Sequence, residues 1–375
     1  MKSPAVPSDA RRIPELDGIR GIAILLVLTA HCFGYSMRGR SWHGYAETLR
    51  TFSRLGNAGV DLFFVLSGFL ITGVLLDSLK DAHYFRSFYA RRALRIFPLY
   101  SLTLLLVGVG YRDAGPFLFL SVLYLSNVCT LFGVPRLYAP LWSLSVEEHF
   151  YLLWPWVVSR LRQRHLWKLC LALIVLVPIL RAAAYNSSEG VAVYFYSWFR
   201  FDELAWGALL AWYTRTSRYK RSHLFPLGCA SMCAVAMLAA ASPTSGGIGP
   251  ALIYTDTSLL SAALICLTLS GDVPLLSAFT RSRPLVKFGE LSYCLYLTNW
   301  LVFRAWDATI GRYPAFAVRV LGPLGALVSR DAVVLVLCLL LAQLSQSFFE
   351  RPILNLKRRF AHIPSSTPAV GSSPA

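Results

Sequence analysis

The sequence predicts an all-α protein that crosses a membrane about ten times. Of its 375 residues, 56% are hydrophobic and only 15% are charged, and the mean hydropathy is +0.54. A water-soluble protein of this length needs a more polar surface than this composition supplies. Apolar runs recur along the chain, and each is close to the roughly 20 residues that a helix needs to cross the hydrocarbon core of a bilayer.

Ten apolar segments are predicted to be membrane-spanning helices. They cover residues 18–36, 57–77, 96–112, 141–158, 167–183, 197–214, 224–241, 252–270, 285–304 and 329–349. An eleventh run, residues 115–133, is predicted to re-enter from the outer face or to lie on it. If it crossed, the basic clusters "RLRQRHLWK" and "RTSRYKR" would move outside. The positive-inside rule therefore favours ten spans with both termini in the cytoplasm.

The segments at the two ends of the chain differ in composition from the apolar centre. We expect a flexible N-terminus over residues 1–12, a single membrane domain over residues 13–356 and a disordered cytoplasmic tail over residues 357–375, which is rich in Pro and Ser. No cleavable signal peptide is evident, because the charged stretch "RRIPELDGIR" precedes the first apolar run. That run is interpreted as a retained span.

The net charge of +17 comes from 36 Lys and Arg against 19 Asp and Glu. The basic residues lie in short clusters between apolar runs, which indicates membrane topology and anionic lipids or phosphorylated ligands as partners, rather than nucleic acid. The eight cysteines are scattered singly, without a Cys-x-x-Cys pair or a zinc-type spacing. No metal site is predicted.

The first span contains two ionisable residues, Arg20 and His31. They are separated by about three helical turns, so they share a face and lie about 16 Å apart along the axis. Ionisable groups inside a membrane are costly and are therefore functional candidates. Histidine is the side chain best suited to proton transfer near neutral pH. The alternative is a structural histidine bonded to a neighbouring helix, with Arg20 reaching to lipid phosphate.

Carboxylates enter two further spans near the predicted outer face. Asp61 begins the second span at the level of His31, where it would orient that ring or cap the helix. Glu147 and Glu148 point about 100° apart on a helix, so at least one faces the bundle interior. A buried carboxylate beside an imidazole is a common acid/base pair. A structural ion pair is the alternative.

Two arginine-containing clusters lie at opposite sides of the membrane. Arg200, Asp202 and Glu203 open the sixth span on the outer side, where they would bind a polar acceptor or cap the helix. On the cytoplasmic side, "FYARRALRIFPLY" places Arg91, Arg92 and Arg95 at spacings that bring guanidinium groups onto one helix face. Arginine clusters suit phosphate recognition, although plain topological charge explains many of them.

An outward acid/base group and an inward phosphate-binding patch together favour group transfer across the membrane. Seven motifs that carry these residues resemble, in the same order, the acyltransferase-3 family of integral membrane acyltransferases. They are "ELDGIRGIAILLVLTAH", "GVDLFFVLSGFLIT", "FYARRALRIFPLY", "LWSLSVEEHFYLLWP", "RFDELAWGALLA", "LSYCLYLTNW" and "FERP". The resemblance spans about residues 13–352, which is nearly the whole chain.

The resemblance implies a multi-pass protein of the bacterial plasma (inner) membrane. Such a protein would transfer an acyl group, usually acetyl, from acyl-CoA to a hydroxyl of a cell-surface polysaccharide, lipopolysaccharide, peptidoglycan or a secondary metabolite. The family motifs fall on the following residues of this sequence: Arg20 and His31; Arg92 and Arg95; Ser143, Ser145, Val146, Glu147 and Glu148; Glu350 and Pro352.

Two departures from the family pattern concern its ninth span and its C-terminus. Many members have a second histidine where this chain has Asn299. Some members also carry a soluble esterase-like domain after the last helix. This sequence ends soon after its last span, so it would act alone or with a separate esterase-like partner.

The mechanism expected from the residues and the resemblance assigns three groups of side chains. His31, Glu147 and Arg20 are the predicted catalytic residues. Arg91, Arg92, Arg95 and Lys287 are predicted to bind the phosphates of acyl-CoA, and Asp61, Glu148, Arg200 and Asp202 to bind the acceptor. Two alternatives are a transporter or flippase of a polar solute, and a membrane partner that delivers acyl groups to an esterase-like protein.

Overall fold

The computed structural model describes residues 13–35, 37, 44, 55–185, 192–216, 219–241, 249–312 and 314–355. Over these residues the chain forms helices joined by turns and short connections, without a β-strand. The predicted all-α class is therefore confirmed for this part of the chain. The expected flexible N-terminus and the cytoplasmic tail lie outside the described residues.

Each of the ten predicted spans coincides with a helix, and helix α1 ends in a short π-helix, η1. The bounds are α1 Pro14–Thr29, η1 Ala30–Tyr35, α3 Ala58–Asp77, α4 Tyr84–Gly110, α6 Leu141–Arg160, α7 Gln163–Tyr185, α9 Phe201–Tyr213, α10 Leu224–Ala241, α11 Gly249–Ser270, α13 Arg283–Thr309 and α14 Ala315–Ser345. The shorter elements are α5 Gly115–Val122, η2 Cys129–Phe132, α8 Ala192–Phe195, η3 Ser197–Phe199, η4 Arg221–His223, α12 Pro274–Thr280, η5 Gln346–Glu350 and α15 Arg351–Asn355.

Within the described residues, six helices are long and apolar enough to cross a membrane. They cover Pro14–Phe33, Ala58–Asp77, Tyr84–Gly110, Gln163–Ala184, Ile253–Ser270 and Ala315–Leu354. Helix α9 is shorter, with 13 residues, and α6 carries the adjacent carboxylates of Glu147 and Glu148. These features are consistent with a multi-pass membrane protein. The count of ten spans and the cytoplasmic termini stay predictions.

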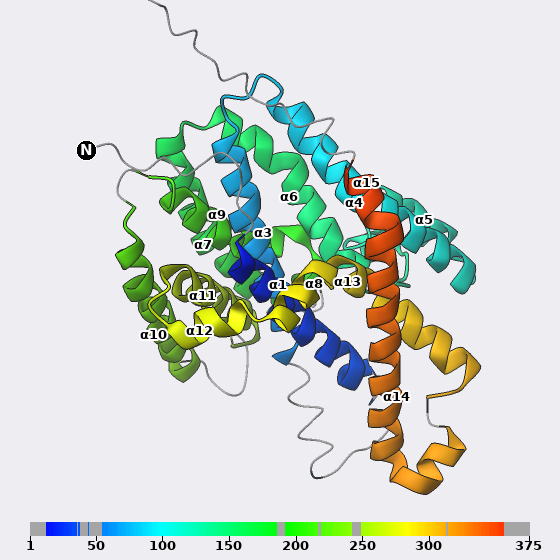
Figure 1. Ribbon diagram of the computed structural model, residues 1–375. Coiled ribbons are helices and arrows are strands. Elements are labelled where there is room, and N and C mark those ends of the chain that lie inside the picture. Colours follow the sequence, from blue (N-terminus) through cyan, green and yellow to red (C-terminus); the bar gives the residue numbers. More distant parts are fainter. Residues whose placement is uncertain are drawn as a thin grey trace, which may run out of the picture.

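The eleventh apolar run, residues 115–133, forms no long helix. It divides into the eight-residue helix α5 and the single turn η2. Eight residues rise about 12 Å, well short of a hydrocarbon core roughly 30 Å thick. Figure 1 shows α5 beside α4 at the edge of the bundle. This geometry agrees with a segment that does not cross the membrane.

Helix α1 packs against α13 with their backbones in direct contact. A Cβ added to Gly21 would stand 2.1 Å from the carbonyl oxygen of Leu285, and one added to Gly289 would stand 1.9 Å from that of Asp17. Small residues at helix crossings allow such close approach in membrane proteins. The crossing fixes the positions of the side chains that α1 and α13 present to each other.

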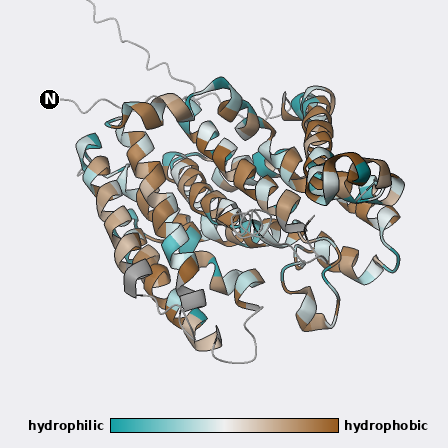
Figure 2. Ribbon diagram, turned by 90° about the horizontal axis from the view of Figure 1, so that it is seen from below, coloured by the Kyte–Doolittle hydropathy of each residue, from teal (hydrophilic) through white to brown (hydrophobic). Residues whose placement is uncertain are grey.

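The outward faces of the bundle are apolar. Exposed large apolar side chains include Leu105 and Val109 on α4, Val175 on α7 and Leu344 on α14. Figure 2 shows hydrophobic residues, coloured brown, along most of the helices. Exposed apolar surface of this extent is typical of helices whose solvent is lipid.

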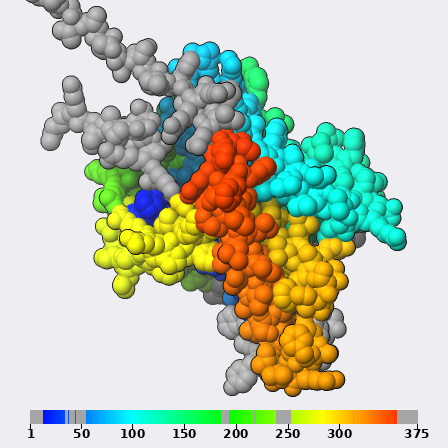
Figure 3. All heavy atoms as spheres, turned by 45° about the vertical axis from the view of Figure 1, so that its right-hand side comes forward, coloured from blue at the N-terminus to red at the C-terminus, as the bar shows by residue number. Residues whose placement is uncertain are grey.

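Helix α14 is bent and runs along one side of the bundle. Its kink is at Gly322, which has φ +71° and is followed by Pro323. A positive φ of this size favours glycine. Figures 1 and 3 show the first part of α14 extending past the body of the bundle, beside the end of α13.

Candidate functional site

A cavity lies between α1, α3, α4, α6 and α13, and most of its charged lining residues are arginines. Its volume is about 100 Å³, which is room for several water molecules. The polar side chains that line it are Arg20, Ser67, Arg92, Arg95, Ser143, Glu147, Tyr151, Ser292, Tyr293 and Tyr296. Five helices that are distant in sequence therefore contribute to one polar site inside an apolar bundle.

Three guanidinium groups line this cavity, and each is partly buried. Arg20 donates to Asp17 one turn earlier on α1, at 3.0 Å. The guanidinium of Arg92 lies over the ring of Tyr151, 4.9 Å from its centroid. Because only one carboxylate, that of Glu147, is among the lining residues, the cavity has an excess of positive charge. Guanidinium groups in this arrangement suit an anionic ligand such as a phosphate.

Glu147 accepts hydrogen bonds from two hydroxyl groups. Ser67 donates to its Oε1 at 2.7 Å, and Tyr151 donates to its Oε2 at 3.2 Å. The structure thus brings Glu147 together with Arg92 and Arg95 in the cavity. The hydrogen-bond partners of Glu147 are Ser67 on α3 and Tyr151 on α6, and not His31. The hydroxyl of Ser67 therefore links α3 to this carboxylate on α6.

Glu148, the next residue on α6, does not line the cavity. It is half-buried, and its Oε1 has no hydrogen-bond partner among the described residues. Arg91 is also half-buried but does not line the cavity, and Lys287 donates to Gln346 at 2.9 Å and lies 3.6 Å from Glu290. The predicted phosphate-binding set therefore divides: Arg92 and Arg95 line the cavity, and Arg91 and Lys287 do not.

His31 lies in the π-helical turn η1, outside the set of residues that line the cavity. Its Nδ1 is 2.8 Å from Oδ1 of Asn299 on α13, and its ring meets Trp300 edge-on at a centroid distance of 5.5 Å. Single turns of π-helix are rare and occur frequently at functional sites. The residue that departs from the family pattern, Asn299, is thus the partner of the predicted catalytic histidine.

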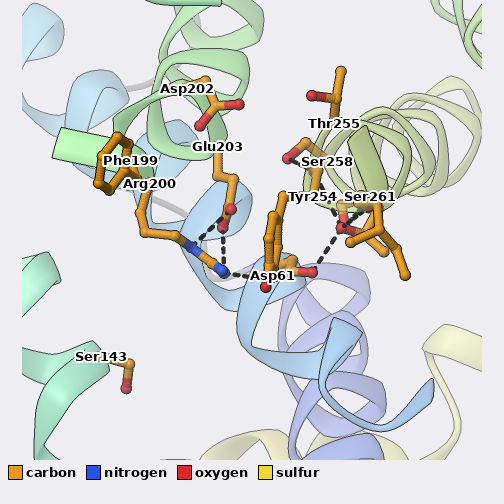
Figure 4. A network of polar contacts seen from close by, with 12 residues as sticks. Asp61, Ser143, Phe199, Arg200, Asp202, Glu203, Tyr254, Thr255, Ser258 and Ser261 are labelled. Atoms are coloured by element: carbon orange, nitrogen blue, oxygen red, sulfur yellow. Dashed lines mark hydrogen bonds and ion pairs between the residues drawn. The ribbon is translucent and has the colours of Figure 1, made fainter. Parts of the chain in front are cut away.

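A second polar group is completely buried between α3, α7, α9 and α11 (Figure 4). Arg200 forms ion pairs with Asp61 and with Glu203, the latter at 2.9 Å. Arg181 binds Asp202 at 2.6 Å. The exposed fraction of these residues is 0%, apart from 4% for Asp61. We call these five residues, together with Thr257 on α11, whose hydroxyl donates to Asp61, the charge network.

The charge network changes the interpretation of Asp61. Its partners are Arg200 and, at 2.6 Å, the hydroxyl of Thr257, so it neither orients His31 nor caps the start of α3. The expected orientation of His31 and the expected helix cap are therefore wrong for Asp61, whereas its predicted role in acceptor binding stays a prediction. Arg200 and Asp202 were predicted to bind an acceptor, but each forms ion pairs with oppositely charged side chains of the same network. Buried ions must be paired in this way because their desolvation is costly.

Sequence reasoning missed Arg181 and Thr257 as members of this network. Arg181 follows the apolar stretch "LALIVLVPIL" inside a predicted span, so the rule that flags ionisable residues within a span identifies it. A threonine in an apolar helix carries no comparable signal. Its hydroxyl becomes informative only when the neighbouring helix places a carboxylate against it.

The described residues form a polytopic helical protein with a cationic cavity, a buried charge network and a half-buried histidine that contacts Asn299. Comparison with known proteins gives its family: residues 13–343 match the acyltransferase-3 family model, described as an acyltransferase domain. The chain belongs to this family and is an O-acyltransferase enzyme. No solved structure matches it.

Several characterised proteins are similar to this chain. Acyltransferase MdmB of Streptomyces mycarofaciens is 28% identical over 336 residues, which cover 82% of this chain and 83% of MdmB. O-acetyltransferase OatA of Staphylococcus aureus is 24% identical over 396 residues, or 94% of this chain and 59% of OatA. Peptidoglycan O-acetyltransferase OatA of Listeria monocytogenes is 30% identical over 38% of this chain and 24% of its own length.

Proposed function

We propose that this enzyme transfers an acetyl group from acetyl-CoA at the cytoplasmic face to a hydroxyl of a carbohydrate, glycoconjugate or secondary metabolite at the outer face. The observation that carries the donor assignment is the cavity itself. Arg20, Arg92 and Arg95 line one cavity together with a single carboxylate. Such an excess of guanidinium groups favours a polyanionic ligand, and the phosphates of coenzyme A have this character.

The names of the relatives support the acceptor class. Two of them are named O-acetyltransferases, and one of these is named for peptidoglycan. MdmB, which matches most of this chain and most of its own length, is named only as an acyltransferase. A glycan hydroxyl and a secondary-metabolite hydroxyl are both compatible with these names, so the acceptor is proposed as one of these two classes.

The reaction needs one proton to move. In the proposed step His31 takes the proton from the acceptor hydroxyl, whose oxygen attacks the thioester carbonyl. The carbon–sulfur bond breaks, the ester forms, and the thiolate of coenzyme A leaves and is protonated. Arg92 and Arg95 hold the phosphates, and Arg20 polarises the thioester carbonyl or holds the arm that leads to it. The arm would bridge the distance of about 16 Å between Arg20 and His31 along α1.

The proposal is tested with purified protein in liposomes and acetyl-CoA that is labelled in the acetyl group. Peptidoglycan fragments and a polyhydroxylated macrocycle serve as acceptor probes, and label in either product is measured. General-base catalysis contributes about 10²–10⁴-fold, so His31→Ala should lose that factor while it still inserts and folds. His165→Ala is the matched control, because His165 lies near the start of α7 and does not line the cavity.

Two results would overturn the proposal. Near-normal acetyl transfer by His31→Ala would remove the histidine from the reaction. Movement of an unmodified solute across the bilayer, without transfer of label, would instead identify a carrier. Transfer that needs an added esterase-like protein would assign the second half of the reaction to that partner.

A further inference from the structure

The amide of Asn299 is held in one orientation by its own helix. Asn299 is completely buried on α13. Its Nδ2 donates to the carbonyl oxygen of Leu295 at 2.6 Å and to that of Tyr296 at 2.9 Å. Both hydrogens of the amide nitrogen are therefore used. A flipped amide would place Oδ1 against two carbonyl oxygens, which repel it, so the hydrogen-bond pattern defines which end is oxygen.

This orientation determines which nitrogen of His31 carries a proton. The oxygen Oδ1 of Asn299 faces Nδ1 of His31 at 2.8 Å and can only accept a hydrogen bond. Nδ1 must then be the donor. In a neutral imidazole only one nitrogen is protonated, so the lone pair is on Nε2.

We propose that Asn299 is a positioning residue that holds neutral His31 in its Nδ1–H tautomer and makes Nε2 the proton acceptor. The role of Nε2 as the proton acceptor rests on the proposed function, whereas the tautomer assignment rests on geometry alone. The next residue, Trp300, meets the imidazole edge-on and restrains its plane. Two consecutive residues of α13 therefore set the tautomer and the orientation of one ring on α1.

The contact between α1 and α13 explains why this pairing is stable. Gly21 and Gly289 bring the two backbones together, so the side chains of η1 cannot slide along α13. Asparagine is also chemically suited to this position, because it supplies two donors for the carbonyl groups and one acceptor for the ring. Leucine has a similar volume but supplies neither.

The tautomer is measured directly by ¹⁵N NMR of histidine-labelled protein in lipid, at a pH at which the ring is neutral. The chain has seven histidines, so the signals of His31 are assigned by their loss in His31→Gln. We expect Nδ1 to give the protonated, pyrrole-type signal and Nε2 the unprotonated, pyridine-type signal. The reverse assignment in the unmodified protein would overturn the inference.

Three variants separate a tautomer effect from a structural one. Asn299→Leu should shift the His31 population toward the Nε2–H form. Asn299→Gln keeps both an amide oxygen and an amide nitrogen, so it should retain the Nδ1–H signature. Asn127→Leu, which removes another buried amide, should leave the His31 signals unchanged. Equal loss of the signature in the Leu and Gln variants would show that the amide oxygen does not set the tautomer.

The activity measurement tests the catalytic half separately. Asn299→Leu should lower kcat for acetyl transfer about 10–100-fold, within the range of general-base catalysis, with KM for acetyl-CoA changed less than twofold. If the NMR signature is as expected but no transfer occurs with any acceptor probe, the proposed function fails and the tautomer assignment stands. If transfer proceeds normally in Asn299→Leu, the positioning role fails and the proposed function stands.

Discussion

The arginine-lined cavity and the charge network use the same side chains in opposite ways. In the cavity, Arg20, Arg92 and Arg95 share one space with a single carboxylate. In the charge network, two guanidinium groups are enclosed by three carboxylates and are completely buried. The first arrangement leaves positive charge to be neutralised by a ligand. The second neutralises its guanidinium groups internally and joins four helices.

This difference shows that an ionisable residue inside a membrane span is not by itself evidence of a binding site. Arg200 and Arg92 both lie within the bundle, but the carboxylates of Asp61 and Glu203 enclose Arg200. Arg92 instead rests on the ring of Tyr151 and faces the cavity. The useful criterion is the balance of charge around each guanidinium group, together with access to space that a ligand can enter.

The largest expected effect would break the charge network. Arg200→Leu leaves the buried carboxylate of Asp61 without its guanidinium partner and leaves Glu203 with only Arg181, at 4.0 Å. Removal of one partner from a buried ion pair costs about 3–5 kcal/mol. Thermal unfolding of the purified protein in detergent checks this expectation. Arg160→Leu, at the exposed end of α6, is the control and should change stability by less than about 0.5 kcal/mol. Normal stability of Arg200→Leu would contradict the structural role.

A smaller effect, on binding rather than folding, is expected in the cavity. Arg92→Gln and Arg95→Gln each remove a charged hydrogen-bond donor, which is worth about 1.5–3 kcal/mol, or roughly 10–100-fold in affinity. We expect KM for acetyl-CoA to rise by that factor while the unfolding temperature changes little. Titration with coenzyme A alone measures the same loss without the reaction. An unchanged affinity would remove these arginines from the donor site.

The smallest effect concerns the two basic residues that the structure separates from the cavity. Arg91→Gln and Lys287→Met should leave KM for acetyl-CoA within about twofold, since exposed ion pairs contribute only about 0–1 kcal/mol. The side chain of Lys287 is 41% exposed, and its partners are Gln346 and Glu290. A KM increase as large as that of Arg92→Gln would restore the four-residue phosphate site predicted from the sequence.

The helices were predictable because each follows from local composition. Apolar runs of about 20 residues placed a helix at all ten predicted positions, including α3 and α10 with bounds within one residue. The predicted start of α4 was less accurate. The helix begins at Tyr84 rather than at residue 96, because its first turns are basic and helical but not apolar. Hydropathy indicates which residues lie in the hydrocarbon core, but it does not indicate where a helix begins.

The partners of each polar residue were not predictable to the same extent. Helical spacing put Arg20 and His31 on one face, but it could not show that His31 meets Asn299 while Arg20 lines the cavity. These contacts depend on which helices are neighbours. That choice is made by close backbone contacts, such as Gly68 against Leu204 and Gly207 against Val65 between α3 and α9. A single sequence identifies the glycines but not the helix that each one meets.

The glycine contact between α1 and α13 has a mechanical consequence. Side chains between two helices can change rotamer and absorb a small displacement, but a backbone pressed against a backbone has no such freedom. Gly21 and Gly289 therefore couple α1 and α13 as one stiff unit that carries Arg20 at one end and His31 at the other. A change in the distance between Arg20 and His31 would therefore require these two backbones to separate.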